Sequence, residues 1–177
     1  MDVDPIRCRL ELTSQGKILK DIINELRNMI YNLRPMSFDD IGFNITVERA
    51  LDKLRNSNNI RCNFKTSGDE YMVDSLVSLT LLRVIQEACS NSIKHGHAKE
   101  INVSLKYEPK SLTLTIKDDG DGFDTSAIPE FTRDDNSGFG LSMMKERIYL
   151  LSGKISISSK PGEGCIVTVS YTHLRAH

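Results

Sequence analysis

Cysteine is sparse in this chain, and it forms no recognisable motif. The four cysteines are scattered, with no C-x-x-C pair among them: Cys8, Cys62, Cys89 and Cys165. Structural zinc sites and redox dithiols normally use such pairs, so the spacing argues against both. Reduced thiols in a cytosolic domain are the simpler interpretation.

Long hydrophobic runs and an excess of one charge are also missing. No apolar stretch approaches the length that spans a bilayer, and the charged opening MDVDPIRCR is unlike a signal peptide. The 23 basic and 24 acidic residues give a formal net charge of -1, which provides no general attraction to nucleic acid or anionic membrane. We therefore expect no nucleic-acid partner, and any basic site must be local.

The segment from Leu12 to Leu33 predicts an amphipathic helix that needs a partner. Its apolar positions recur at alternating steps of three and four: Leu19, Ile22, Leu26, Met29 and Leu33. Ile18, Ile23 and Ile30 widen this heptad stripe toward the face of a helical bundle. One such helix cannot bury the face alone, so the pattern favours dimerisation, with packing against its own domain as the alternative. Pro35 ends the helix.

The rest of the chain alternates between helical and strand patterns. Helical periodicity covers Ile45 to Leu54, Ser75 to His95 and Gly140 to Leu151. Strand patterns cover Ile60 to Lys65, Ile101 to Tyr107, Ser111 to Lys117, Lys154 to Ser159 and Cys165 to Tyr171, with turns at 56–59 and 66–69. This order predicts a two-layer α/β sandwich with a mixed sheet and helices on one face, preceded by the N-terminal helix. We expect residues 1–36 to form the helical segment, 37–171 the globular domain and 172–177 a tail.

One helix carries a stripe of chemistry-bearing side chains. Glu87 and Asn91 are four residues apart and therefore share a helix face, with Lys94 and His95 following. The Asn91 carbonyl could bind magnesium without adding charge beside a triphosphate, and Glu87 could polarise an attacking group. Both side chains could instead simply solvate the helix, which is the usual fate of these residue types.

Two glycine-bearing boxes follow that helix, and both let backbone approach a ligand. The first is DDGDG at 118–122, where Asp118 follows an apolar strand and can accept a hydrogen bond from an exocyclic amine. Asp119 and Asp121 are expected to be exposed turn residues. Calcium is discounted because the spacing of an EF-hand is absent. The second box is GFGL at 138–141, which ends an aperiodic loop and opens a helix.

The three boxes in this order resemble the ATP-binding domain of sensor histidine kinases, in the superfamily that also includes gyrase B subunits and mismatch-repair ATPases. The resemblance runs from Ser75 to Tyr171, and the wording NSIKHGHAKEINVSL, DDGDGF and SGFGLSMMKERI is most similar to the nitrate-sensor type. It implies a Bergerat-type ATP-binding fold that uses ATP and Mg²⁺.

The resemblance also implies individual roles. Asn91 would bind magnesium, and Glu87 would be the catalytic acid or base. The remaining nucleotide-binding positions would be Lys94 and His95 at the phosphates, Asp118 at the adenine N6, Gly120 and Gly122 at the pocket floor, Gly138 and Gly140 at the phosphates, and Leu141 beneath the nucleotide. His97 is expected to be a surface group, and the loop 125–137 would close over the site as a lid.

One position departs from the family pattern. After Gly162-Glu163-Gly164 the family usually has a threonine whose hydroxyl supports the adenine-reading aspartate, while this chain has Cys165. A thiol is a poorer hydrogen-bond partner than a hydroxyl. We therefore expect either weaker nucleotide binding or a substitute partner for Asp118.

A kinase of the type that the chain resembles transfers the γ-phosphoryl group of ATP to a histidine on a helical dimer, and then to an aspartate of a response regulator. The histidines here are His95, His97, His173 and His177, and none lies in such a helix. The segment from Leu12 to Leu33 resembles the second helix of the dimerisation hairpin. We expect a homodimer through this helix in the parent protein, and a chain that binds ATP and magnesium without phosphorylating itself.

The resemblance further implies a cytoplasmic domain of a membrane-anchored bacterial sensor, with the anchor outside this chain. Two other functions remain open. A protein serine kinase of the anti-sigma-factor type would share the ATPase fold and would work without the helix from Leu12 to Leu33. A non-catalytic module would act through its helical dimer face and show no magnesium-dependent ATP binding.

Overall fold

The computed structural model describes residues 42–125 and 139–172. The chain divides into two units, Met1–Met36 and Ser37–His177, and every described residue belongs to the second. Its elements in chain order are α3 (Phe43–Asn58), β1 (Arg61–Ser67), α4 (Ser75–Lys94), β2 (Glu100–Glu108), β3 (Ser111–Asp118), α5 (Phe139–Leu150), β4 (Lys154–Ser159) and β5 (Cys165–Thr172). The predicted N-terminal helix, the lid loop 126–137 and residues 173–177 lie outside the described residues.

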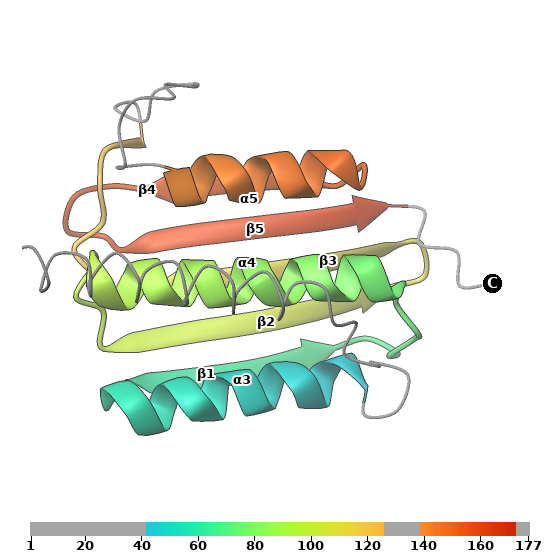
Figure 1. The fold of residues 1–177 in the computed structure, drawn as a ribbon, viewed down its shortest axis with the longest axis horizontal. Helices are drawn as coiled ribbons and strands as arrows, with labels where there is room; N and C mark the ends of the chain where they lie inside the picture. The colour runs from blue at the N-terminus through green and yellow to red at the C-terminus, as the bar shows by residue number, and fades with distance from the viewer. Residues whose placement is uncertain (1–41, 126–138, 173–177) are drawn as a thin grey trace, which may run out of the picture. The chain divides into compact units, whose positions relative to one another are not determined.

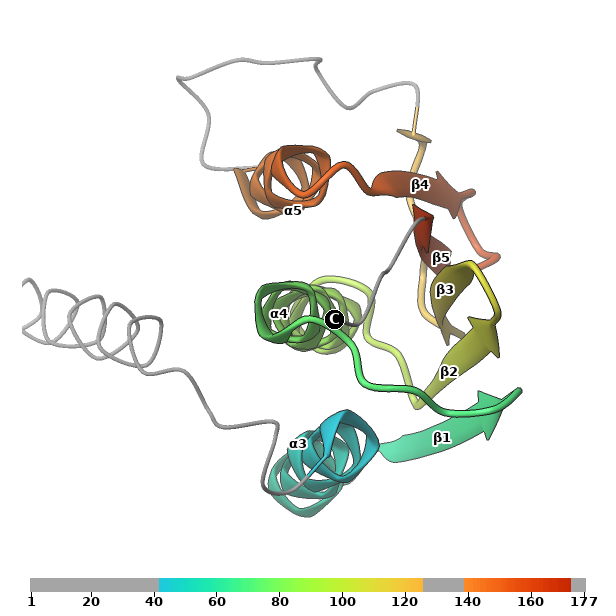
Figure 2. The same ribbon diagram turned by 90° about the vertical axis from the view of Figure 1, so that its right-hand side faces the viewer.

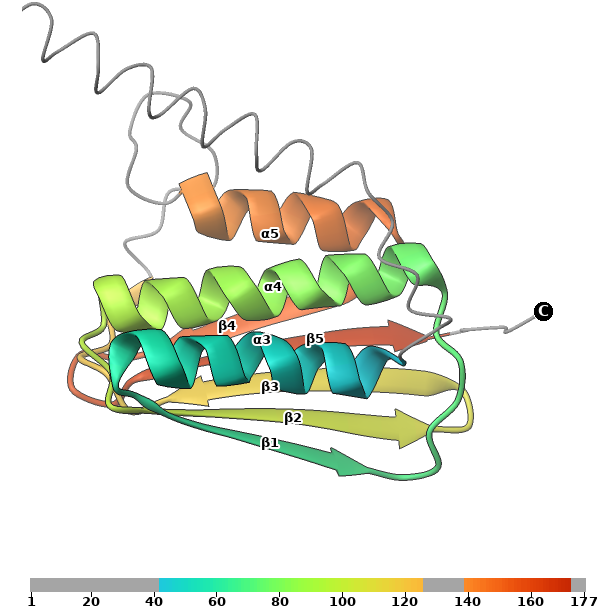
Figure 3. The same cartoon turned by 60° about the horizontal axis from the view of Figure 1, so that its bottom comes forward.

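A single five-stranded sheet forms one layer of the domain, in the order β1-β2-β3-β5-β4 (Figure 1). β1 pairs with β2 in parallel, while the other three pairings are antiparallel, so the sheet is mixed. The three helices form the second layer on one face of this sheet, with α4 between α3 and α5 (Figures 2 and 3). This confirms the predicted two-layer α/β sandwich, and it confirms the hairpins β2–β3 and β4–β5.

The helices begin and end where capping chemistry allows. The Asp74 carboxylate accepts hydrogen bonds from the backbone nitrogens of Leu76 and Val77 at 2.9 and 3.2 Å, which satisfies two free donors at the start of α4. α3 ends at Asn58, and its C-cap Asn59 adopts the left-handed conformation, with φ 50°, that commonly terminates a helix. The central helix α4 is therefore fixed at the end remote from its chemistry-bearing stripe.

The core lies between the two layers. Buried residues alternate with exposed ones along β2 and with mostly half-buried ones along β3, as expected for strands with one covered face. The largest fully buried side chains come from both layers: Val47, Leu51, Leu81, Val84, Ile85, Ile101, Leu105, Leu112, Leu114, Ile116, Ile148 and Tyr171. The uncovered face of β2 carries polar residues such as Asn102, Ser104 and Lys106.

Several element boundaries differ from prediction, and three of the differences change a predicted turn, strand end or tail. α3 continues through Asn58, so most of the predicted turn at 56–59 is helical. β1 continues to Ser67 because its ladder with β2 extends that far. β5 includes Thr172, which pairs with Ser111 and so belongs to the sheet and not to a tail.

No helix within 42–125 or 139–172 combines the length and the apolar character needed to cross a membrane.

Candidate functional site

The three sequence boxes meet at one end of the sandwich. Helix α4 and strand β3 end there, and helix α5 begins there. The turn between β4 and β5 lies at the same end, at the left of Figure 1. The residues that were predicted to act together are separated along the sequence, and the topology brings most of them to this end. Gly138 lies outside the described residues.

Asp118, the last residue of β3, is held by donors from three segments. Its side chain is buried, with 6% of the residue exposed. Oδ1 accepts hydrogen bonds from the backbone nitrogen of Gly120 at 2.9 Å and from that of Cys165 at 3.2 Å. Oδ2 lies 2.6 Å from the hydroxyl oxygen of Ser92 on α4. An ionised carboxylate has about four acceptor positions, so this carboxylate can still accept a hydrogen bond from a ligand.

Close backbone contacts surround Asp118 and explain the glycines of the first box. A Cβ added to Gly120 would lie 2.4 Å from the backbone oxygen of Gly96. One added to Gly122, whose φ is +63°, would lie 2.0 Å from the backbone oxygen of Lys160. Neither gap admits a side chain, so both positions require glycine. The α4–β2 loop, the β3 end and the β4–β5 turn are thereby packed against one another.

Glu87 and Asn91 lie side by side on α4, as their spacing predicted. The Asn91 amide nitrogen donates to Glu87 Oε1 at 3.2 Å. Gly140, at the start of α5, packs directly on this pair, because an added Cβ would lie 2.1 Å from Glu87 Oε1 and 3.7 Å from Asn91 Nδ2. The second glycine box therefore meets the acid-amide pair in space, and both side chains are partly exposed.

The remaining predicted residues occupy the rim of this region. Lys94 ends α4 and His95 is its C-cap, whose backbone nitrogen donates to the Asn91 oxygen at 2.9 Å, and both side chains are exposed. Leu141 is half-buried and packs against the core. His97 is exposed and contacts the Asp121 carboxylate, with 2.7 Å between Nδ1 and Oδ2. This contact ties the α4–β2 loop to the first glycine box.

The hydroxyl partner that Cys165 cannot give Asp118 is supplied by a residue of α4. The Cys165 side chain is only partly buried, and burial and the neighbouring Asp118 carboxylate raise the pKa of its thiol to about 11. Its recorded contact with Asp118 is made by the backbone nitrogen. The hydroxyl partner of Asp118 is Ser92, a residue that the sequence analysis did not single out. Its position directly after Asn91 was the available signal, since adjacent helix residues can face different parts of one site.

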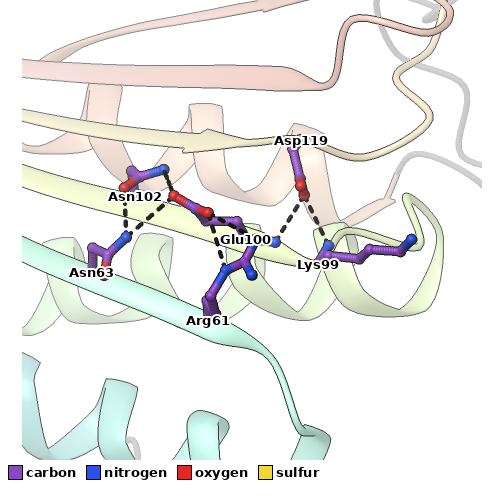
Figure 4. Close-up of polar contacts among 6 residues, drawn as sticks. All are labelled: Arg61, Asn63, Lys99, Glu100, Asn102 and Asp119. Atoms are coloured by element: carbon purple, nitrogen blue, oxygen red, sulfur yellow. Dashed lines mark hydrogen bonds and ion pairs between the residues drawn. The ribbon is translucent and has the colours of Figure 1, made fainter.

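Asp119 was predicted to be an exposed turn residue, and it is exposed but also structural. Its Oδ1 accepts hydrogen bonds from the backbone nitrogens of Lys99 and Glu100, both at 2.8 Å (Figure 4). These bonds, led by the one from Glu100, lower the pKa of the Asp119 carboxyl. Asp119 thus ties the end of β3, beside Asp118, to the start of β2.

A polar network continues from that point across the exposed face of β1 and β2. Glu100 accepts from Arg61 Nε and from the Asn63 amide, each at 3.2 Å, and Asn63 also donates to Asn102 Oδ1 at 3.0 Å (Figure 4). These residues face one another in the parallel register of the two strands. Cross-strand contacts of this kind favour one register over another.

The donor set is suited to a magnesium nucleotide more than to a preformed metal centre. No cluster of three or more histidine, cysteine, aspartate or glutamate residues that could hold a metal occurs in the described part of the chain. Magnesium commonly takes one or two protein oxygens and completes its shell with phosphates and water. A single amide carbonyl beside a carboxylate, as in Asn91 and Glu87, fits this kind of binding.

Comparison with known proteins identifies the family. The family model described as histidine kinase-, DNA gyrase B-, and HSP90-like ATPase matches residues 77–175. The match begins within α4 and extends past the end of β5, so it includes all three boxes.

Two curated relatives and one solved structure illustrate the similarity. The chain is 32% identical to the signal transduction histidine-protein kinase/phosphatase DegS of Brevibacillus brevis over 160 residues, which are 90% of this chain and 40% of that protein. It is 34% identical to an uncharacterized sensor-like histidine kinase of Chloroflexus aurantiacus over 172 residues, 96% of this chain and 29% of that protein. The chain thus spans less than half the length of either relative. The histidine kinase AdeS of Acinetobacter baumannii has a similar fold, with a TM-score of 0.56 and 21% identity over 99% of this chain and 88% of that one.

Proposed function

The chain belongs to the family of histidine kinase-, DNA gyrase B- and HSP90-like ATPases, as the ATP-binding catalytic domain of a sensor histidine kinase, and we propose that it transfers the γ-phosphoryl group of ATP to a histidine that is absent from this chain. The observation that carries this proposal is the Asp118 carboxylate. It is buried, accepts from donors in α4, the turn after β3 and the first residue of β5, and retains an acceptor position for a ligand amine.

Adenine would bind at Asp118, with Gly120 and Gly122 forming the pocket floor. The carboxylate can accept a hydrogen bond from the exocyclic amine of adenine. An added Cβ at either glycine would collide with neighbouring protein backbone, so the glycines keep this turn closely packed beside Asp118. Leu141, half-buried at the start of α5, offers an apolar contact to the nucleotide.

The phosphates would lie toward the start of α5. Gly138 and Gly140 would expose backbone nitrogens at this helix end, where anions are favoured. Lys94 and His95 would add cationic or neutral donors from the end of α4. Both side chains are exposed.

Asn91 is the proposed ligand for Mg²⁺. Its amide nitrogen donates to Glu87, which leaves the side-chain carbonyl as the branch available to a metal. When bound, the metal would neutralise charge on the β- and γ-phosphates, which is its usual part in phosphoryl transfer.

Glu87 is the proposed acid-base residue. In the transfer, an imidazole nitrogen of the acceptor histidine forms a bond to the γ-phosphorus while the bond to the bridging oxygen breaks, and ADP leaves. Glu87 would accept a hydrogen bond from the acceptor imidazole and take up the proton that the attacking ring loses. The hydrogen bond from Asn91 holds Glu87 at the site.

The sensor histidine kinase assignment suggests how the domain works in its parent protein. We propose a cytoplasmic domain that acts within a homodimer formed by the N-terminal helix, with a response-regulator receiver domain as the downstream partner. The relatives that support this are named as histidine kinases. The anti-sigma-type serine kinase would need no dimerisation helix, and the non-catalytic module would not need Glu87.

Calorimetric titration of the whole chain with a non-hydrolysable ATP analogue tests nucleotide binding, with and without magnesium. We expect binding that strengthens with magnesium. Absence of any binding of the analogue would contradict the proposed function.

Chemistry is tested separately by supplying γ-labelled ATP and a dimerisation-hairpin peptide that carries an acceptor histidine. We expect acid-labile label on the peptide and none on the chain itself. Glu87→Gln should keep analogue binding within about threefold while lowering transfer by about 10²-fold, the usual scale of general acid-base catalysis. Acid-stable label on a serine of a partner would favour the serine-kinase alternative, and stoichiometric label on the isolated chain would contradict the expected lack of autophosphorylation.

A further inference from the structure

We propose that Ser92 is a positioning residue for base selection, whose hydroxyl orients the Asp118 carboxylate so that its remaining acceptor position favours a 6-amino purine over a 6-oxo purine. The inference rests on the proposed function, because it assumes that a purine nucleotide binds at Asp118.

The distances around Ser92 Oγ indicate which of two acceptors receives its hydroxyl hydrogen bond. Oγ lies 2.6 Å from Asp118 Oδ2 and 2.9 Å from the backbone oxygen of Ala88. A hydroxyl has one hydrogen and can donate to only one of the two acceptors. The carboxylate is the stronger acceptor and lies closer. Within an α-helix the Ala88 carbonyl also accepts from the backbone nitrogen four residues later, so it keeps a partner without the hydroxyl.

The three bonds to Asp118 divide its two oxygens unequally. Oδ1 accepts from both Gly120 and Cys165 backbone nitrogens, which occupies its two acceptor positions. Oδ2 accepts from Ser92, which leaves one acceptor position on that oxygen. All three partners are donors, so toward a ligand this carboxylate acts only as a hydrogen-bond acceptor. A 6-amino group can donate to Oδ2, whereas a 6-oxo group would face it as a second acceptor.

The surroundings make the Ser92 contact difficult to replace. Ser92 is 7% exposed and Asp118 is 6% exposed, so the bond is formed away from bulk water. The side chain at 165 is a thiol, and its residue contacts Asp118 through the backbone nitrogen. Loss of the Ser92 hydroxyl would therefore leave Oδ2 without its donor, while Oδ1 stays held by the two backbone nitrogens, so the position of Oδ2 would be less well fixed.

The test compares the affinities of Mg²⁺-bound non-hydrolysable ATP and GTP analogues for the whole chain. Ser92→Ala should weaken binding of the ATP analogue by about tenfold, the effect of losing a hydrogen bond to a charged group. Binding of the GTP analogue should change by less than about threefold, so the preference for ATP narrows. The double variant Ser92→Ala with Cys165→Thr should recover part of the preference, because it places a hydroxyl beside the same carboxylate.

Ser78→Ala is the matched control. Ser78 is also buried on α4, and its hydroxyl contacts the backbone oxygen of Val73 at 3.5 Å, near the other end of the helix. This variant should lose a hydroxyl without changing either affinity. If Ser92→Ala does not fold, Ser92→Cys keeps the side-chain size with a weak donor and should show the same narrowed preference.

The outcomes distinguish a failure of the proposed function from a failure of the role proposed for Ser92. If the wild-type chain binds no ATP analogue, the proposed function fails and this inference fails with it. If the wild type binds but Ser92→Ala keeps its preference for ATP, or loses affinity for both analogues equally, only the role of Ser92 is overturned. An equal loss would mean that the hydroxyl supports the pocket in general and does not select the base.

Discussion

Asn91 donates a hydrogen bond to Glu87 one helical turn earlier, with 3.2 Å between Nδ2 and Oε1. This contact gives the two side chains different roles. The Asn91 nitrogen is engaged within the protein while its carbonyl remains for a cation, and one oxygen of Glu87 is held by a neutral donor. The pair can therefore provide a metal ligand and a base without placing two negative charges together.

Asn91→Ala should remove the magnesium dependence of nucleotide binding. The variant loses the carbonyl ligand, so affinity for the magnesium-bound analogue should fall by about tenfold, which corresponds to about 1.4 kcal/mol. Affinity measured in a chelator should stay unchanged. Calorimetry with and without magnesium gives both values. Asn102→Ala is the control, because its amide lies in the network on β1 and β2, and an equal loss there would contradict the assignment.

Gly140→Ala should separate stability from activity. The new Cβ would lie 2.1 Å from Glu87 Oε1, the end of a flexible side chain, so Glu87 can swing away without moving the backbone. Alanine favours helix over glycine by up to about 1 kcal/mol, and the free energy of unfolding should be unchanged or slightly higher. Phosphoryl transfer should fall by about 10²-fold.

Glu146→Ala is the comparison for that experiment, since Glu146 is exposed further along α5. Its transfer rate should match the wild type. Urea unfolding and the labelled-peptide assay supply the two measurements. A Gly140→Ala protein with full transfer activity would show that Glu87 does not need its observed position.

Gly164→Ala and Gly162→Ala should differ although both glycines have positive φ, +73° and +81°. Each substitution forces alanine into a left-handed conformation, at a cost of about 1–2 kcal/mol. At Gly164 the Cβ would also lie 2.2 Å from the backbone oxygen of Asp118, while at Gly162 nothing lies within 4 Å. Gly164→Ala should therefore lose further stability and nucleotide binding, and Gly162→Ala should bind normally. Thermal unfolding and calorimetry test this, and equal binding by both variants would contradict it.

Alkaline pH should destabilise the domain through its buried thiols. Burial raises the pKa of Cys89 to about 12 from an ordinary value of 9.0. A raised pKa stabilises the fold fully below the unfolded value, and this stability is lost as pH rises from about 9 toward 12. The loss is about 1.4 kcal/mol per pH unit for one such thiol.

Urea unfolding at pH 8 to 10.5 measures that slope. Cys89→Ala should start from a lower stability because it leaves a cavity, but its stability should fall less steeply with pH. Cys165 and Tyr171, whose pKa values are raised to about 11 and about 12, are retained in the variant, so part of the slope should remain. The same slope in both proteins would show that Cys89 is not responsible.

Periodicity was sufficient to predict the layers of this fold. The stripe from Ser75 to His95 became α4, which ends at Lys94, and alternation along β2 and β3 gave the correct hairpin. Residues at element ends were harder to assign. Asn58 was predicted as a turn because asparagine is common there, but it continues α3, and the left-handed residue that ends the helix is Asn59.

The candidate site was partly visible in the sequence for the same reason. Spacing of four on a helix is a local property, so the Glu87–Asn91 contact could be predicted. The contacts that hold Asp118 join positions 26 and 47 residues away, Ser92 and Cys165. Nothing local marks such pairs, and only the packing of α4 and β5 beside β3 brings them together. For the same reason, the structural role of Asp119 could not be inferred from its place in a turn.

Asn91 and Ser92 are consecutive on α4, yet in the proposed site Asn91 would meet the phosphates, while Ser92 contacts Asp118, the proposed base-binding residue. Consecutive helix positions are rotated by about 100°, so a small roll of this helix would move both contacts at once. Base recognition and metal binding would then depend on the position of the same helix. A nucleotide whose base does not bind at Asp118 would also disturb Asn91, the proposed magnesium ligand.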